Sequence, residues 1–309
     1  MNNTTIAHWY LITDGLILTC SAIGTIVSMV FVLTVTVSRQ ERHSLPNLID
    51  CNTQLPIFLL SLVTVRSIVK VLRSDLYHFQ IDDFLCVWRG YLVYSEFANI
   101  FYSFATQSYY RYVLVKYSAR PHFSSMKTMF TIMILQWVII HGMMLFLPLG
   151  NFIDFDIESQ MCTVSLFSRS IIWLVTGFVY LPPCKIIAFV YIRLAILSRD
   201  SRIRAANVIV NNSHRELQLI KGMLLVLSIF AISGVPYSIF AILALFKKNL
   251  LPVYYYRIIT CFNAVALAIG SNIIFWQNMS VRKTIIHFLL QKNNQHIHPQ
   301  CIARFRARI

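Results

Sequence analysis

Charged residues are scarce in this sequence. Asp, Glu, Lys and Arg make up 13% of its 309 residues, whereas a soluble domain carries about twice that share. Glycine and proline number nine each, which excludes a collagen-like or a low-complexity disordered chain. A glycine-rich phosphate loop, cysteine pairs at zinc spacing and a serine-nucleophile elbow are all missing. We therefore expect no enzyme, no catalytic residues, no cofactor and no metal site.

Long apolar runs fill the sequence between its few charges, and the mean hydropathy is +0.63. Seven of these runs exceed the roughly 20 residues that a helix needs to cross a bilayer. They span residues 13–37, 45–72, 83–114, 126–149, 168–197, 215–246 and 252–277. A shorter stretch, 281–290, separates charged from apolar side chains, as a helix lying on a membrane surface does. The sequence predicts an all-α membrane protein, a seven-transmembrane helix bundle with a short amphipathic eighth helix.

The net charge of +15 could point to a nucleic-acid partner, but the positive charges fall in short segments between the apolar runs. With the N-terminus outside, 18 Lys and Arg lie in inner segments and eight in outer ones. This asymmetry predicts an outside N-terminus and an inside C-terminus. We expect an extracellular segment (1–12), a seven-transmembrane domain (13–279) and a cytoplasmic amphipathic helix with a basic tail (280–309). We therefore expect the chain to lie in the lipid bilayer of the plasma membrane, and we do not expect it to bind nucleic acid.

The stretch from Cys86 to Arg111 is expected to form the central helix of the bundle. Its 25 residues of helical rise cover about 37 Å, slightly more than a bilayer core. Between its ends only Arg89 and Glu96 are charged, and small polar residues are frequent. Such a composition suits a helix surrounded by other helices rather than by lipid. Glu96 is expected to flank the interior, either as the polar centre of the bundle or as a protonated carboxyl bound to a neighbour.

Several motif residues stand at a joint spacing that resembles the rhodopsin-like (class A) G-protein-coupled receptors, over about residues 12–290. They are Cys86 placed 25 residues before Tyr110-Arg111-Tyr112, Trp137, Pro148, Cys162, Pro183 with Tyr191, and Glu216 with Phe230 and Pro236. Other positions depart from the family pattern, so the chain resembles a divergent, orphan-type member. Tyr110 replaces the acid before the motif arginine, Ile57 the aspartate of the second helix, Gly234 the tryptophan of the sixth, and Asn272 the proline of the seventh.

The resemblance implies roles for specific residues. Cys86 and Cys162 would form a disulfide outside the membrane. Arg111 would pair with Glu216 in the inactive state. The switch that couples to a G protein would comprise Arg111, Tyr112, Glu216, Tyr191, Phe230 and Pro236.

The ligand cavity would be lined by Arg66, Arg89, Val93, Tyr237 and Arg257. Val93 stands 18 residues before Arg111, where receptors for amines carry an aspartate, so a simple amine is not the expected ligand. Arginines in a partly desolvated cavity favour a carboxylate, a phosphate or an acidic peptide. The alternative is that these arginines are neutralised by nearby acids, namely Asp75, Asp82, Asp83 or the acidic second outer loop from Asp154 to Glu158.

The expected function is that of a receptor that transduces an extracellular ligand, a peptide or an anionic small molecule, to a heterotrimeric G protein. A membrane transporter or channel is the alternative, although no inverted repeat is visible in the sequence. A third reading is a receptor-like protein that no longer signals, because several motif residues are replaced.

Overall fold

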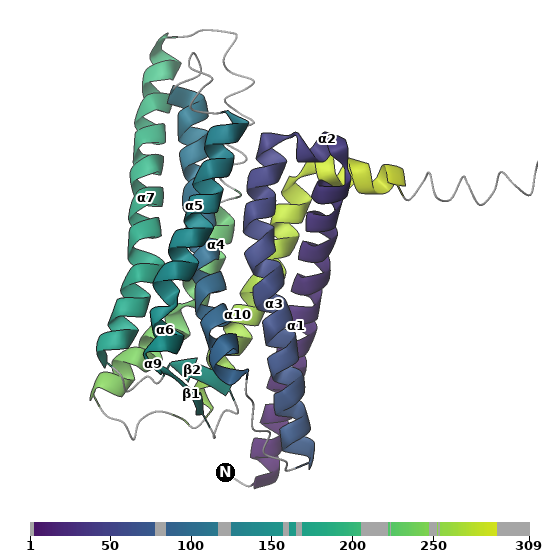
Figure 1. The fold of residues 1–309 in the computed structure, drawn as a ribbon, viewed down its shortest axis with the longest axis vertical. Helices are drawn as coiled ribbons and strands as arrows, with labels where there is room; N and C mark the ends of the chain where they lie inside the picture. Colours follow the sequence, from purple (N-terminus) through teal and green to yellow (C-terminus); the bar gives the residue numbers. More distant parts are fainter. Residues whose placement is uncertain are drawn as a thin grey trace, which may run out of the picture.

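The computed structural model describes residues 3–77, 85–116, 125–156, 161–164, 169–204, 222, 224–246, 252 and 254–288. These residues form a bundle of long helices with one short β-hairpin (Figure 1). The first half of the chain contributes α1 (Asn3–Val37), α2 (Arg39–Arg42), α3 (Leu45–Tyr77), α4 (Cys86–Lys116), α5 (Met126–Met144) and α6 (Phe146–Leu149). The second half contributes β1 (Ile153–Asp156), β2 (Met161–Val164), α7 (Arg169–Arg204), a helix over 224–233, α9 (Val235–Phe246), α10 (Tyr255–Gln277) and a helix over 279–288.

The seven expected spans are confirmed. Six helical segments among the described residues are long and apolar enough to cross a membrane, and α4 adds the seventh. Their outward faces carry large apolar side chains, such as Val138 at 63% exposure and Ile192 at 62%. Exposing so many apolar side chains to water would be unfavourable, whereas contact between these side chains and lipid is not. The chain is therefore a multi-pass membrane protein.

The central position of α4 explains why its composition is more polar than that of the other spans. It packs against α3, α5 and α7 and lies between α3 and α5 in the bundle (Figure 1). Ser95, Asn99, Ser103 and Ser108 on this helix are fully buried. Because protein surrounds the helix, its polar groups find protein partners instead of facing hydrocarbon. The expectation of a central helix from Cys86 onward is confirmed.

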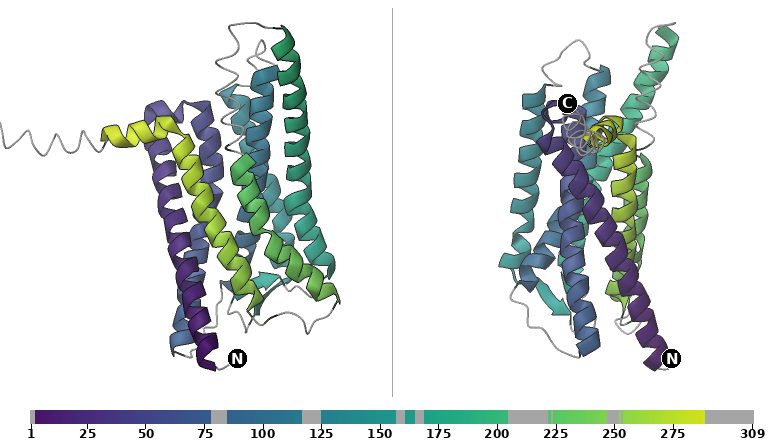
Figure 2. Two further views of the ribbon diagram at one scale, coloured as in Figure 1. Left: turned by 180° about the vertical axis from the view of Figure 1, so that it is seen from behind. Right: turned by 90° about the vertical axis from the view of Figure 1, so that its right-hand side faces the viewer.

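A β-hairpin that was not predicted from the sequence lies at the end of the bundle that carries the N-terminus; we call this end the outer end and the opposite one the inner end, following the orientation expected from the charges. Its strands pair antiparallel, with Ile153 opposite Val164, and Cys162 forms the expected disulfide with Cys86 at the start of α4. A Cβ atom at Gly90 would lie 2.6 Å from Ile153 and 3.2 Å from the carbonyl oxygen of Cys162. The hairpin therefore rests directly on the backbone of α4, at the end of the bundle where the N-terminus lies (Figures 1 and 2).

The sixth span is interrupted at Gly234, between the helix 224–233 and α9. Pro236 follows two residues later, and it has no N–H to continue the helical hydrogen bonds. The Gly234 N–H is instead shared between the carbonyls of Phe230 and Ala231, at 3.3 and 3.2 Å. This break supports the expectation that the sixth helix bends at this point.

The amphipathic helix 279–288 extends sideways from the end of α10 and projects away from the bundle, at the end opposite the N-terminus (Figure 2). Asn278 caps it, because the Asn278 side chain accepts a hydrogen bond from the backbone N–H of Val281 at 3.1 Å. The buried carboxylate of Glu41, from α2, accepts hydrogen bonds from Ser280 and Thr284 at 2.7–2.9 Å. These contacts fix the helix against the first inner loop.

Candidate functional site

An outer cavity of about 90 Å³ lies under the β-hairpin, between α3, α4 and α10. Arg89 and Val93 of α4 are among its lining residues, together with several neutral polar side chains. Those polar residues are Thr64 and Ser67 of α3, Thr163 of β2, and Thr260 and Asn263 of α10. Among the described lining residues Arg89 alone carries a charge. One Arg89 nitrogen lies 3.7 Å from the sulfur of Cys162, so the disulfide holds the hairpin against this wall of the cavity.

Arg257 occupies a different place from the one expected. Its guanidinium binds Asp14 of α1 at 3.0 Å and Asp75 of α3 at 2.8 Å, and it lies 4.2 Å from the ring centroid of Tyr10. Arg257 is 3% exposed and is not a lining residue of the outer cavity. In the structure, nearby acids thus neutralise Arg257, as in the alternative reading of the sequence. The residue ties α10 to the outer ends of α1 and α3.

Two further expected wall residues also lie away from this cavity. Arg66 is exposed on α3, and Tyr237 of α9 packs against the main apolar core. Neither lines the cavity. Arg66 lies on the exposed face of α3, and α9 contributes none of the described lining residues. The sequence could place these residues in the outer half of the bundle but not on a particular wall.

Between the two ends of the bundle, α4 meets the sixth and seventh spans through aromatic side chains. Phe230 is fully buried and lies 6.4 Å from Phe101 and 6.0 Å from Phe104, between ring centroids. On the other side it touches Gly270 of α10, where a Cβ atom would come within 2.8 Å of its ring. Tyr180 of α7 stacks edge-on against Phe101 at 4.8 Å. A shift of α4 would therefore disturb its contacts with α7 and with the sixth span, and through Phe230 the contact between the sixth span and α10.

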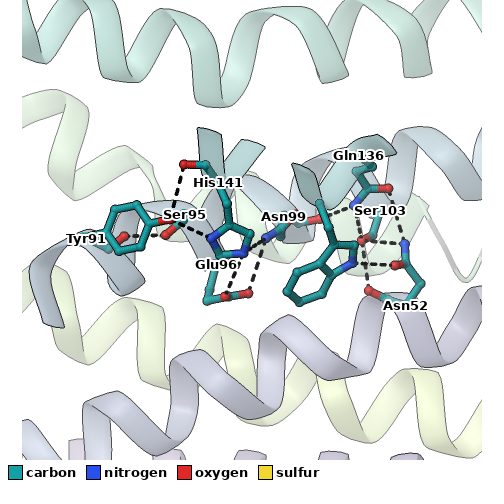
Figure 3. Close-up of polar contacts among 9 residues, drawn as sticks. Asn52, Tyr91, Ser95, Glu96, Asn99, Ser103, Gln136 and His141 are labelled. Atoms are coloured by element: carbon teal, nitrogen blue, oxygen red, sulfur yellow. Dashed lines mark hydrogen bonds and ion pairs between the residues drawn. The ribbon is translucent and has the colours of Figure 1, made fainter. Parts of the chain in front are cut away.

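A polar seam joins α4 to α5 and α3 (Figure 3). Toward α3, Asn52 accepts a hydrogen bond from the Trp137 ring nitrogen at 2.9 Å and also contacts Ser103. Toward the outer end, the carboxylate of Glu96 lies 3.4 Å from His141, and Tyr91 bonds the other ring nitrogen of His141 at 3.0 Å. Glu96 therefore faces α5 instead of forming the polar centre of the bundle.

An inner cavity of about 30 Å³ lies at the opposite end, around Arg111. Asp50 of α3, Gln107 of α4, Val226 of the helix 224–233 and Gln277 of α10 line it with Arg111. A Cβ atom at Gly222 would overlap the side chain of Gln277, so the sixth span is packed closely against α10 here. Among the described residues, Gly222 and Gln277 therefore close one side of this cavity.

The other expected switch residues lie in part beside this cavity. Tyr191 of α7 lies near Arg111 and Ser108, and the Tyr112 ring lies 5.3 Å below the Lys116 ammonium. Pro236 lies just beyond the break at Gly234. Glu216, the expected ion-pair partner of Arg111, lies outside the described residues.

A family model described as the seven-transmembrane receptor of the rhodopsin family matches residues 28–270. The chain belongs to the rhodopsin family of seven-transmembrane receptors. The crystal structure of squid rhodopsin matches it with a TM-score of 0.76 and 18% sequence identity, over 92% of this chain and 86% of that one. At this identity the likeness shows the fold alone. A search among curated proteins found no significant match.

Sequence reasoning missed two charged residues that the receptor places inside the bundle, Asp14 and Asp50. Asp14 is 2% exposed, and Asp50 lines the inner cavity. Each is an acid within or at the edge of an apolar run, and acids inside a membrane span mark functional or structural sites. That signal was present in the sequence and could have identified both.

Proposed function

We propose that the receptor transduces an extracellular ligand, an anionic small molecule or a peptide, to a heterotrimeric G protein. It would act at the plasma membrane, with its N-terminus extracellular. The observation that supports this proposal most strongly is that α4 runs from a polar outer cavity at Arg89 to a polar inner cavity at Arg111. One helix thus lines a polar cavity with an arginine at each end.

The outer cavity supports a compact anionic ligand or the acidic end of a peptide. A volume of about 90 Å³ has room for about six water-sized groups, so it would hold one small head group without rearrangement. The guanidinium of Arg89 can bind a carboxylate or phosphate with two parallel hydrogen bonds. The hydroxyls and amide around it supply the neutral hydrogen bonds that orient such a group.

The closed inner end supports a two-state mechanism. A ligand can shift the receptor toward an open state only by binding that state more tightly. The break at Gly234 and the contacts of Phe230 with α4 and α10 give the sixth span a place to bend when α4 moves. Opening at Gly222 and Gln277 would then expose Arg111 to a G protein.

A screen of anionic small molecules and acidic peptides, read out by GTP exchange on purified G proteins, tests this proposal. For an agonist found in this way, Arg89→Gln should reduce potency by about tenfold or more, the effect of losing a charge-assisted hydrogen bond. Arg73→Gln is the matched control, because Arg73 is an exposed arginine at the outer end of α3 that does not line the cavity. A cationic amine agonist, or equal potency in both variants, would contradict the proposed ligand chemistry.

A further inference from the structure

The Arg111 guanidinium is incompletely satisfied by the described residues around it. Its Nη1 atom is buried and has no hydrogen-bond acceptor among them. An arginine keeps its charge at any physiological pH, and a buried guanidinium without an acceptor is costly. The preceding residue, Tyr110, has no carboxylate to offer. The unpaired Nη1 atom therefore favours an acceptor from elsewhere in the fold, and a carboxylate would be the strongest one.

Asp50 lies across the same inner cavity from another helix. Both side chains line the cavity, and the positive charge of Arg111 acts on the Asp50 carboxylate. The volume of about 30 Å³ is enough for a bridging water molecule. A carboxylate inside an apolar bundle needs a cation as much as the arginine needs an anion.

The Asp50 carboxylate is held in position by donors from two other elements. The Asn278 side-chain nitrogen donates to one oxygen at 3.0 Å, and Gln107 approaches the other at 3.5 Å. Gln107 stands one turn before Arg111 on α4 and is itself fixed by a 2.7 Å hydrogen bond to Thr53. The carboxylate is therefore directed toward the part of α4 that carries Arg111.

We infer that Asp50 of α3 supplies the carboxylate that holds the Arg111 guanidinium while the receptor is closed. Because Asp50 also binds Asn278 at the inner end of α10, one carboxylate links α3, α4 and α10 around the cavity that the sixth span closes. Opening of the cavity would weaken these contacts together. The inference rests on the proposed function only in identifying this closed state with the non-signalling one.

A thermal-stability cycle on the purified receptor tests the pairing without any G protein. Asp50→Asn should lower the melting midpoint of the wild-type receptor and have little effect in an Arg111→Gln background, with a non-additivity of about 3 °C or more. Additive effects would show that Asp50 is bound only by Asn278 and Gln107, and would overturn the inference. Coupling of Arg111 to Glu216→Gln instead of Asp50→Asn would overturn it as well.

A second measurement reports the conformation. Fluorophores attached through unnatural amino acids at Lys116 and Leu224 follow the distance between the inner ends of α4 and the sixth span. Asp50→Asn should increase the share of the long-distance population, and the double variant Asp50→Asn/Gln107→Glu should restore the short one. That exchange moves the carboxylate across the cavity while keeping the size of both side chains.

Glu41→Gln is the control, because it neutralises another buried inner carboxylate that does not line the cavity. It should leave the distances unchanged. An equal opening in Glu41→Gln, or no restoration in the double variant, would overturn the assignment. If both measurements give the expected results and no G protein responds to the receptor, the pairing stands and the proposed signalling function fails.

Discussion

Replacing Arg257 by glutamine should destabilise the receptor rather than alter ligand recognition. The side chains of Arg257 and Asp14 are 4% and 1% exposed, and their nearest atoms are 3.0 Å apart. Glutamine retains hydrogen-bonding capacity but no charge, so the Asp14 carboxylate would remain buried without a cation. Removing one partner of a buried ion pair costs about 3–5 kcal/mol.

The effect should be visible in the melting midpoint of purified receptor in detergent, followed with a fluorescent unfolding dye at one scan rate. Each kcal/mol shifts the midpoint of a large domain by about 2–4 °C, so Arg257→Gln should lower it by about 6 °C or more. Asp75→Asn should have a smaller effect, about 1 kcal/mol or less, because the Asp75 side chain is 36% exposed.

The double variant Arg257→Gln/Asp14→Asn provides the control, since it removes the uncompensated charge together with the arginine. It should melt at a higher temperature than Arg257→Gln alone. If Arg257→Gln melted at the wild-type temperature, the three charges would not hold α1, α3 and α10 together.

Three further outcomes follow from the structure. Ile57 is fully buried and offers no oxygen to a hard cation, so equal concentrations of sodium and potassium should give the same melting midpoint. A midpoint higher in sodium would reveal a site built from other residues. Gly90→Val should displace the hairpin, because its Cβ atom would lie 2.6 Å from Ile153, and thiol labelling should then detect Cys86 or Cys162 unpaired; full disulfide formation would show that the hairpin can move aside. An epitope tag at residue 1 should stain intact cells and a tag at residue 309 should not, whereas the reverse staining would refute the proposed orientation.

The spans and their order could be predicted because the bilayer imposes a minimum length on every apolar helix. The central helix followed from the polar composition of the Cys86–Arg111 stretch, since a span with so many polar groups must be covered by protein. The break in the sixth span followed from Pro236, which removes a backbone donor whatever its surroundings. These predictions depend on the chemistry of neighbouring residues in the sequence and on the thickness of the bilayer core.

The partners of the charged residues could not be predicted in the same way. Arg257, Asp14 and Asp75 come from three helices and meet only because α1 and α3 extend beyond α10 at the outer end. Glu96 lies near the expected face of α4, but a rotation of a few tens of degrees decides whether it meets the bundle interior or His141 of α5. The four-residue strands β1 and β2 carry no alternation long enough to be recognised. Each of these outcomes depends on packing between distant segments.

In the proposed mechanism, α4 links an outer ligand cavity to a G-protein switch at Arg111. Because Asp50→Asn is expected to open the inner end, it allows this claim to be tested before any ligand is known. The measurement is GTP exchange on a panel of purified heterotrimeric G proteins, catalysed by wild-type, Asp50→Asn and Arg111→Gln receptor at equal concentration. We expect at least one heterotrimer on which the Asp50→Asn receptor catalyses exchange about tenfold faster than the wild type, whereas the Arg111→Gln receptor gives no exchange above the receptor-free rate. If no heterotrimer responds to the wild type or to Asp50→Asn, while both remain folded, the chain is not a G-protein-coupled switch.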